Sequence, residues 1–162
     1  MTNLLKFYTK ADKIITTFMQ DYGILFLRIS LGIIFFWFGF LKFIPGLSPA
    51  DQIATQTISV LSFGLLKPSV SLVILAIWET LIGIGLMTGK FLRIILLLLF
   101  TQMLGTLTPL VIFPAETFSH FPYAPTLEGQ YIIKNLVLIS AGLVVGATVR
   151  GGRIREVEDT LH

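Results

Sequence analysis

Six polar side chains interrupt segments of this sequence that are otherwise almost entirely apolar. They are Arg28, Lys42, Glu79, Gln102, Lys134 and Asn135. A carboxylate in apolar surroundings can titrate, pair with a cation or bind a polar ligand. Ammonium, guanidinium and amide groups beside it can donate hydrogen bonds. We therefore take these six residues as candidate ligand-binding residues, assign none of them a catalytic role, and predict no metal site.

The elements that must position these residues are four long apolar runs. They cover residues 24–44, 70–88, 94–113 and 131–149, and each is long enough to cross a bilayer as a helix. The runs are continuously apolar, which favours helices over strands. Hydrophobic residues make up 54% of the chain and charged residues only 13%, about half the charge of a soluble domain. The sequence predicts one all-α domain over residues 1–162, an integral membrane four-helix bundle.

Depth along the runs indicates which polar groups meet. Glu79 lies at the midpoint of its run, Gln102 lies at a similar level, and Lys134 and Asn135 lie about one turn from an end. We expect these four side chains to form a polar cluster. Glu79 would either pair with Lys134 or be protonated, because an unpaired buried carboxylate is strongly disfavoured. A structural clamp that holds the helices in register is the alternative to a binding site.

The first run carries a stripe of residues at helical spacing. Arg28, Gly32, Phe35, Gly39 and Lys42 follow one another at intervals of four, three, four and three residues. All five should therefore lie on one helix face, where the glycines allow a second helix to approach closely. The two cations lie near enough to the ends of the run for their charges to reach the membrane interface.

The segments outside the runs predict additional structure. Residues 4–18 have the pattern of an amphipathic helix that lies on the membrane surface. A short helix on the outer surface should begin after Ser48 and continue to about Gly64. The loop 114–130, which is rich in proline and aromatic residues, should form a lid over the same end, with Thr126 as the N-cap of the last helix.

The distribution of lysine and arginine predicts the orientation. Lys42 and Lys67 fall at one end of the bundle. Eight basic residues fall at the other end, namely Lys6, Lys10, Lys13, Lys90, Arg93, Arg150, Arg153 and Arg155. By the positive-inside rule both termini should be cytoplasmic.

Composition also limits cofactors and partners. The chain has no cysteine and only two histidines, both outside the apolar runs, so we predict no covalently bound cofactor. A formal charge of +3, spread along the chain, predicts no nucleic-acid partner. The predicted partner is the lipid bilayer.

The spacing of the polar and glycine residues resembles that of the DoxX-like superfamily. The shared pattern is Arg28-x3-Gly32-x6-Gly39-x2-Lys42 and Glu79-x3-Gly83-x-Gly85-x3-Gly89. The chain is more closely similar to the YkgB/RclC branch. The runs that carry this similarity are Leu47-Ser48-Pro49-Ala50, QMLGTLTPLVIFPAETF from Gln102, and APTLEGQYIIKNLVLISAGL from Ala124.

The resemblance implies a bacterial inner-membrane protein with a role in oxidative and reactive-chlorine stress. The superfamily includes a subunit of a thiosulfate:quinone oxidoreductase, which makes a quinone the candidate ligand. Three functions stay open. The chain could be a redox-linked component that binds a quinone or small molecule at Glu79 and works with a membrane partner or as a homo-oligomer. It could instead be a proton-coupled carrier or exporter, or a non-catalytic scaffold, so whether it is an enzyme is also open.

Overall fold

A computed structural model describes residues 2–44, 46–48 and 51–152, with side chains described from residue 7 onward. Four residues named above lie outside the described residues, namely Pro49, Ala50, Arg153 and Arg155. The side chain of Lys6 also lies outside them. The elements in chain order are α1 Thr2–Leu41, α2 Asp51–Leu61, α3 Pro68–Thr88, α4 Leu92–Leu107, α5 Pro109–Ile112, α6 Pro114–Thr117, β1 Phe118–His120, β2 Ala124–Pro125 and α7 Leu127–Ala147.

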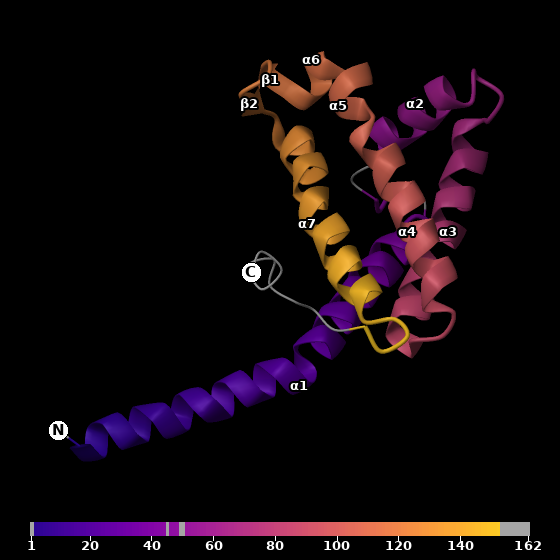
Figure 1. Cartoon of the computed structure of the whole chain (residues 1–162). Helices are drawn as coiled ribbons and strands as arrows, with labels where there is room; N and C mark the ends of the chain where they lie inside the picture. Colours follow the sequence, from indigo (N-terminus) through magenta and orange to yellow (C-terminus); the bar gives the residue numbers. More distant parts are fainter. Residues whose placement is uncertain (1, 45, 49–50, 153–162) are drawn as a thin grey trace, which may run out of the picture.

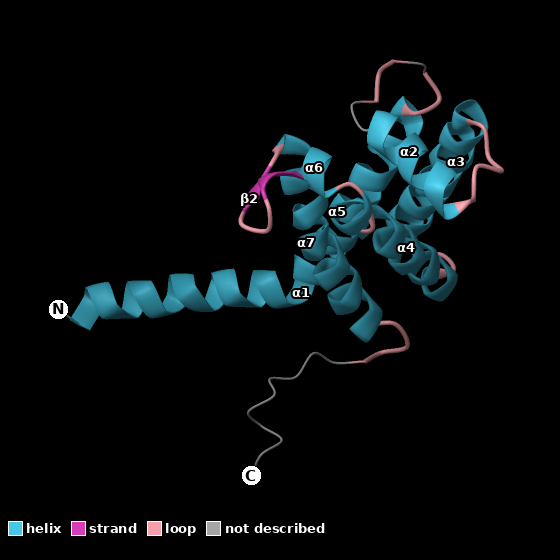
Figure 2. Cartoon of the chain, turned by 90° about the horizontal axis from the view of Figure 1, so that it is seen from above, coloured by secondary structure: helices cyan, strands magenta, loops and turns pink. Residues whose placement is uncertain are grey.

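The four long helices form a bundle in which each helix contacts two others. Helix α1 packs mainly against α3, α3 packs against α4, α4 packs against α7, and α7 returns to α1 (Figures 1 and 2). Within the bundle the four candidate spans are Phe7–Leu41, Pro68–Thr88, Leu92–Ile112 and Leu127–Ala147. The core between them is aliphatic and includes Leu31, Ile82, Leu86, Leu99 and Val145. The prediction of an all-α membrane bundle is confirmed.

The first helix differs from the sequence-based prediction in its continuity. We expected a surface helix over residues 4–18 and a separate span from residue 24, whereas α1 is one uninterrupted helix from Thr2 to Leu41. Its N-terminal part extends away from the bundle (Figure 1). The helix also ends three residues before the predicted end at residue 44. Lys42 therefore lies in the turn that follows α1 rather than within a helix.

Proline and capping residues set the ends of the later helices. The predicted run 94–113 is divided into α4 and α5 at Pro109, whose ring nitrogen has no hydrogen to donate to the preceding helical turn. Helix α7 begins at Leu127, directly after the predicted N-cap Thr126 and four residues before the apolar run 131–149. The Thr126 hydroxyl accepts a hydrogen bond from the Gly129 N–H at 3.2 Å, so the predicted N-cap is confirmed.

Helix α2 and the segment from α5 to β2 gather at one end of the bundle, which we call the cap end (Figure 1). The opposite end carries the tight turn between α3 and α4, and we call it the hairpin end. Helix α2 stops at Leu61 rather than near Gly64, because Phe63 and Gly64 adopt left-handed backbone angles of φ 53° and 75°. The antiparallel pair β1–β2 in the predicted lid was not anticipated.

Glycines allow α1 and α3 to pack at unusually short range, as the stripe in α1 predicts. A Cβ atom on Gly39 would lie 2.7 Å from the backbone nitrogen of Thr80, and one on Gly32 would lie 2.6 Å from the Met87 side chain. From the other side, a Cβ on Gly83 would overlap the backbone of Phe36. Backbone atoms cannot move aside as flexible side chains can, so Gly39 and Gly83 require glycine.

We predict that Gly83→Ala destabilises the bundle, because its new methyl group would force α1 away from α3. The expected cost is about 1–3 kcal/mol, the usual range for overpacking a close contact. Thermal unfolding of the purified protein in detergent would measure it. Gly105→Ala in α4 is the matched control, since a Cβ there meets nothing within 4 Å. Equal unfolding midpoints for the two variants would contradict the prediction.

Candidate functional site

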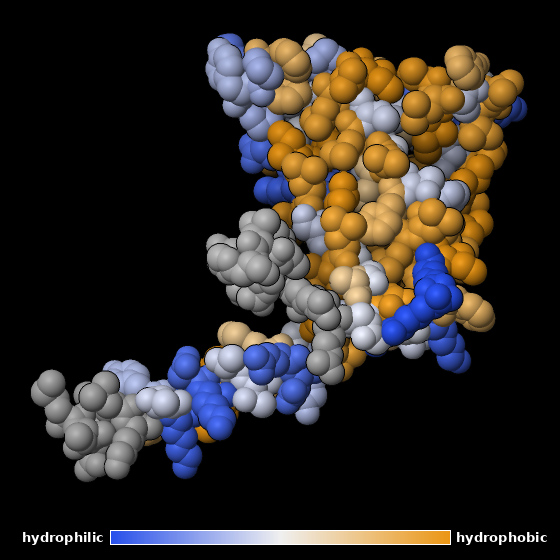
Figure 3. All heavy atoms as spheres, viewed as in Figure 1, coloured by the Kyte–Doolittle hydropathy of each residue, from blue (hydrophilic) through white to orange (hydrophobic). Residues whose placement is uncertain are grey.

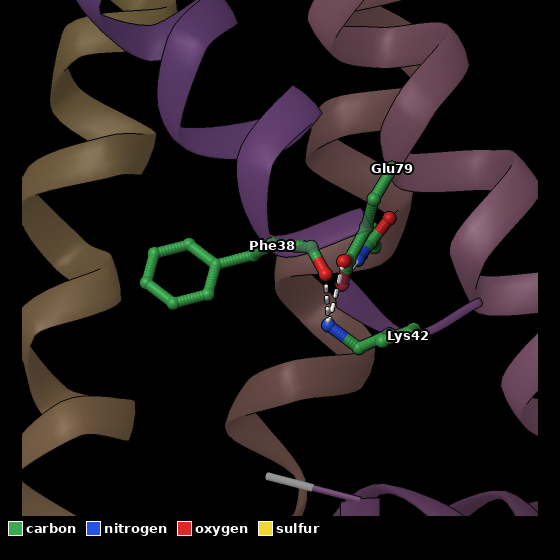
Figure 4. A network of polar contacts seen from close by, with 4 residues as sticks. Phe38, Lys42 and Glu79 are labelled. Atoms are coloured by element: carbon green, nitrogen blue, oxygen red, sulfur yellow. Dashed lines mark hydrogen bonds and ion pairs between the residues drawn. The ribbon is translucent and has the colours of Figure 1, made fainter. Parts of the chain in front are cut away.

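A carboxylate in the middle of α3 is bonded by side chains from two other parts of the chain, the turn after α1 and helix α4. The Lys42 Nζ atom lies 2.6 Å from Glu79 Oε2 and forms both an ion pair and a hydrogen bond with it. The Gln102 Nε2 atom donates to Glu79 Oε1, also at 2.6 Å. Lys42 makes a further, longer bond of 3.4 Å to the Phe38 carbonyl (Figure 4). Each oxygen of the Glu79 carboxylate therefore has its own donor.

The end of α1 places Lys42 at this depth. Because Gly39 packs against Glu79 and Thr80, the last turn of α1 lies beside the middle of α3 rather than beside its start. The turn after Leu41 then directs Lys42 toward the carboxylate, while the Phe38 ring points away from it (Figure 4). Gln102 approaches from α4. Three parts of the bundle thus meet at one side chain.

The site is almost fully enclosed by protein. The side chains of Lys42 and Glu79 are only 7% and 10% exposed, and Gln102 is equally buried. A charge in such a low-dielectric setting is costly unless an opposite charge and hydrogen bonds compensate it. Lys42 supplies the opposite charge and Gln102 supplies a neutral donor. Lys42 and Glu79 therefore stabilise each other, and removing either one would leave the other charge buried without compensation.

Two polar atoms beside the ion pair have no hydrogen-bond partner among the described residues. They are the second amide atom of Gln102, Oε1, and the hydroxyl of Thr80. Other helical Thr hydroxyls bond a carbonyl three or four residues before them, as Thr106 does to Met103 at 2.9 Å and Thr88 does to Ile84 at 2.8 Å. Thr80 makes no such bond. The Gln102 Oε1 atom can therefore accept a hydrogen bond from an additional polar group, and the Thr80 hydroxyl can donate or accept one.

The structure brings together only part of the predicted cluster. Glu79 and Gln102 meet as expected, but the prediction that Lys134 joins them is wrong, and of the two alternatives for Glu79 the pairing with Lys134 is excluded, since Lys42 is the paired cation. Lys134 is exposed, with its Nζ 5.3 Å from the centre of the Tyr131 ring. Asn135 donates to the Thr106 hydroxyl at 3.4 Å. Both residues lie on α7, which packs against α4 and α1 rather than against α3.

Arg28 lies at the hairpin end, away from the ion pair. Its guanidinium contacts the backbone at Gly89, where an added Cβ would overlap it. Gly89 is the C-cap of α3, so the cation lies near the negative end of that helix. Ten residues of helix, about 15 Å, separate this position from Glu79. Arg28 is therefore not part of the polar site.

Sequence analysis missed three polar side chains that carry a buried oxygen without a partner among the described residues, of which Thr80 and Asp51 lie near the site. Besides Thr80, they are those of Asp51 and Gln56 in α2. Asp51 is close enough to interact electrostatically with Glu79. Helix α2 reaches this region because α1 ends early, and no sequence signal marks that end. Thr80 could have been found, since it follows Glu79 directly and lies opposite the glycine stripe.

Four apolar helices around a buried acid–base pair define a multi-pass membrane protein of the helical-bundle class. Residues 23–114, more than half of the chain, match the DoxX family, and the chain belongs to that family. The matched segment contains Lys42, Glu79 and Gln102, whereas Lys134 and Asn135 lie outside it. No curated protein matches the chain, and no solved structure matches it either. Membership of the YkgB/RclC branch stays a prediction.

We predict that Lys42→Met is strongly destabilising, because it leaves the Glu79 carboxylate buried without a cation. Breaking a buried pair costs about 3–5 kcal/mol. The double variant Lys42→Met/Glu79→Gln should recover much of this loss, since no unpaired charge is left. Lys134→Met, an identical change at an exposed position, should have little effect. Thermal unfolding in detergent compares the variants, and a similar loss for Lys134→Met would contradict the assigned pairing.

Proposed function

We propose that this DoxX-family protein is a component of the bacterial oxidative and reactive-chlorine stress response. In this proposal it resides in the inner membrane, and its Lys42–Glu79–Gln102 site binds a quinone or another small redox-linked molecule. The observation that carries the proposal is the buried ion pair, which leaves Gln102 Oε1 and the Thr80 hydroxyl without partners. Polar atoms at such depth are disfavoured unless a bound group completes their hydrogen bonds.

The residues present suit a quinone headgroup. A quinone carbonyl accepts hydrogen bonds, which the Thr80 hydroxyl and the Lys42 ammonium can donate. The reduced form carries hydroxyls, for which Gln102 Oε1 is an acceptor. Such a ligand supplies two-electron redox chemistry when it is bound. The chain's own contribution would be to orient the headgroup, to exclude water and to hold a proton at the Glu79 carboxylate.

A second candidate function is proton-coupled transport. The short Lys42–Glu79 contact supports it, because a proton can be exchanged between a carboxylate and a solute that displaces the ammonium. A carrier of only four spans would need to assemble with other copies. Uptake or efflux by protein reconstituted in liposomes would favour this function over ligand binding. A scaffold, the third candidate, would keep its activity without Glu79.

We also propose that both termini and the hairpin end face the cytoplasm. The excess of basic residues at that end supports this orientation.

We predict that a cysteine introduced at Gln52 or Ser119 reacts with an impermeant maleimide in intact spheroplasts. Both positions are exposed at the cap end. A cysteine at Gly152, exposed at the opposite end, should react only after the membrane is permeabilised. The native chain has no cysteine, so each label reports a single site. Labelling at Gly152 alone in intact spheroplasts would reverse the proposed orientation.

We predict that loss of the Lys42–Glu79 ion pair weakens quinone binding by at least about tenfold, because the hydrogen bond from the charged Lys42 ammonium contributes about 1.5–3 kcal/mol. The probe is a short-chain ubiquinone analogue, titrated against the fluorescence of the two tryptophans, one of which, Trp78, adjoins Glu79. The variant is Lys42→Met/Glu79→Gln, which leaves no unpaired charge. Cells that carry this variant should also lose protection against hypochlorous acid.

The matched control is Glu128→Gln, which removes a carboxylate at an exposed position in the first turn of α7. It should bind the analogue as the native protein does. Equal binding by the native protein, the control and the double variant would refute the quinone site. Full hypochlorous-acid protection by a normally abundant double variant would favour the scaffold function instead.

A further inference from the structure

A groove separate from the Glu79 site runs between α4 and α7 near the hairpin end. Its volume is about 330 Å³. The residues that line it are Arg93, Leu96, Leu97, Phe100, Gly146 and Val149. One cation and an otherwise apolar lining give the groove two chemically different parts. No residue of the Lys42–Glu79–Gln102 site takes part in it.

Gly146 leaves room for the groove. A Cβ on this glycine would be 3.4 Å from the nearest atom of Leu96, an ordinary contact distance. The backbone of α7 therefore tolerates a side chain here, and any longer one would extend into the groove. One turn earlier, a Cβ on Gly142 would lie 3.2 Å from Leu99 and Phe100, so α7 and α4 are packed more tightly there.

Arg93 is the cation in the groove lining, and two more basic residues lie close to lining residues in the sequence. Arg93 lies in the first turn of α4, Lys90 precedes it by three residues, and Arg150 directly follows the groove residue Val149. All three are exposed, and within the described part of the chain none has an acidic partner. The space-filling view shows hydrophilic atoms at the hairpin end and a hydrophobic surface above them (Figure 3).

The apolar part of the groove lies on the exposed surface of the candidate spans. Leu97 is 65% exposed, and neighbouring apolar side chains along α4 and α7, such as Leu104 and Leu143, are exposed to a similar degree. Arg93 lies at the end of a candidate span, which is the depth of the lipid headgroups. A molecule that fits this arrangement has an anionic headgroup and a hydrocarbon chain.

We propose that the groove binds an anionic phospholipid. Its phosphate would lie against Arg93, with Lys90 and Arg150 adding positive charge, and one acyl chain would lie along Leu97 and Phe100. Basic residues at the membrane surface attract anionic lipids in this way. A second copy of the chain in parallel orientation is a poorer occupant, because it would bring the same cations to the same end.

Native mass spectrometry of the detergent-purified protein can test the site with two lipids that differ only in headgroup. Dioleoylphosphatidylglycerol should bind more tightly than dioleoylphosphatidylcholine. Arg93→Gln should weaken binding of the anionic lipid about fivefold, from about 1 kcal/mol per basic residue, and should leave the zwitterionic lipid unaffected. Gly146→Leu should weaken binding of both lipids, because its side chain would fill the apolar groove.

Two matched controls accompany these variants. Lys67→Gln removes an exposed cation at the cap end, and Gly105→Leu adds the same side chain to α4 where nothing lies within 4 Å. Neither should change lipid binding.

If Gly146→Leu fails to fold, Arg93→Gln decides alone, since it alters only an exposed side chain. The proposal would be overturned if the native protein bound both lipids with equal affinity and Arg93→Gln changed neither affinity. A Gly146→Leu variant with altered oligomeric state and unaltered lipid binding would also overturn it.

Discussion

The ion pair between Lys42 and Glu79 is the constraint on which the arrangement of the bundle depends. A carboxylate in the middle of an apolar helix has few ways to be stabilised, and each requires a neighbour at a defined depth. Lys42 meets this requirement only because α1 ends at Leu41, beside the middle of α3. Because α1 ends early, it does not extend along the first half of α3. Helix α2 packs against α3 instead.

Close packing of α1 on α3 is the second part of the same arrangement. Gly39 and Gly83 remove the side chains that would hold the two backbones apart, and Gly39 lies directly beside Glu79 and Thr80. Gln102 then joins α4 to the pair. Helix α7 is outside this network and is connected to α4 mainly by apolar contacts and the Asn135–Thr106 bond. The polar site therefore belongs to three helices of the four.

The two ends of the bundle differ in chemistry as a consequence. The cap end holds the short helices and the β1–β2 pair. The hairpin end has short connections, exposed cations and a groove beside Gly146. The ion pair is a buried polar environment within the bundle, whereas the hairpin end presents exposed cations beside an apolar groove. One chain thus contains two chemically different environments at different levels of the bundle.

The sequence alone determined the membrane class, the number of long helices, the glycine stripe and the proximity of Glu79 to Gln102. These follow from hydropathy and helical spacing, which are local properties of each run. It could not determine that Lys42 rather than Lys134 meets Glu79, because both cations lie at plausible depths on apolar helices. That choice depends on where α1 ends and on which helices are neighbours. Only tertiary packing decides these, since it places α7 against α4 and α1 and turns Lys134 outward.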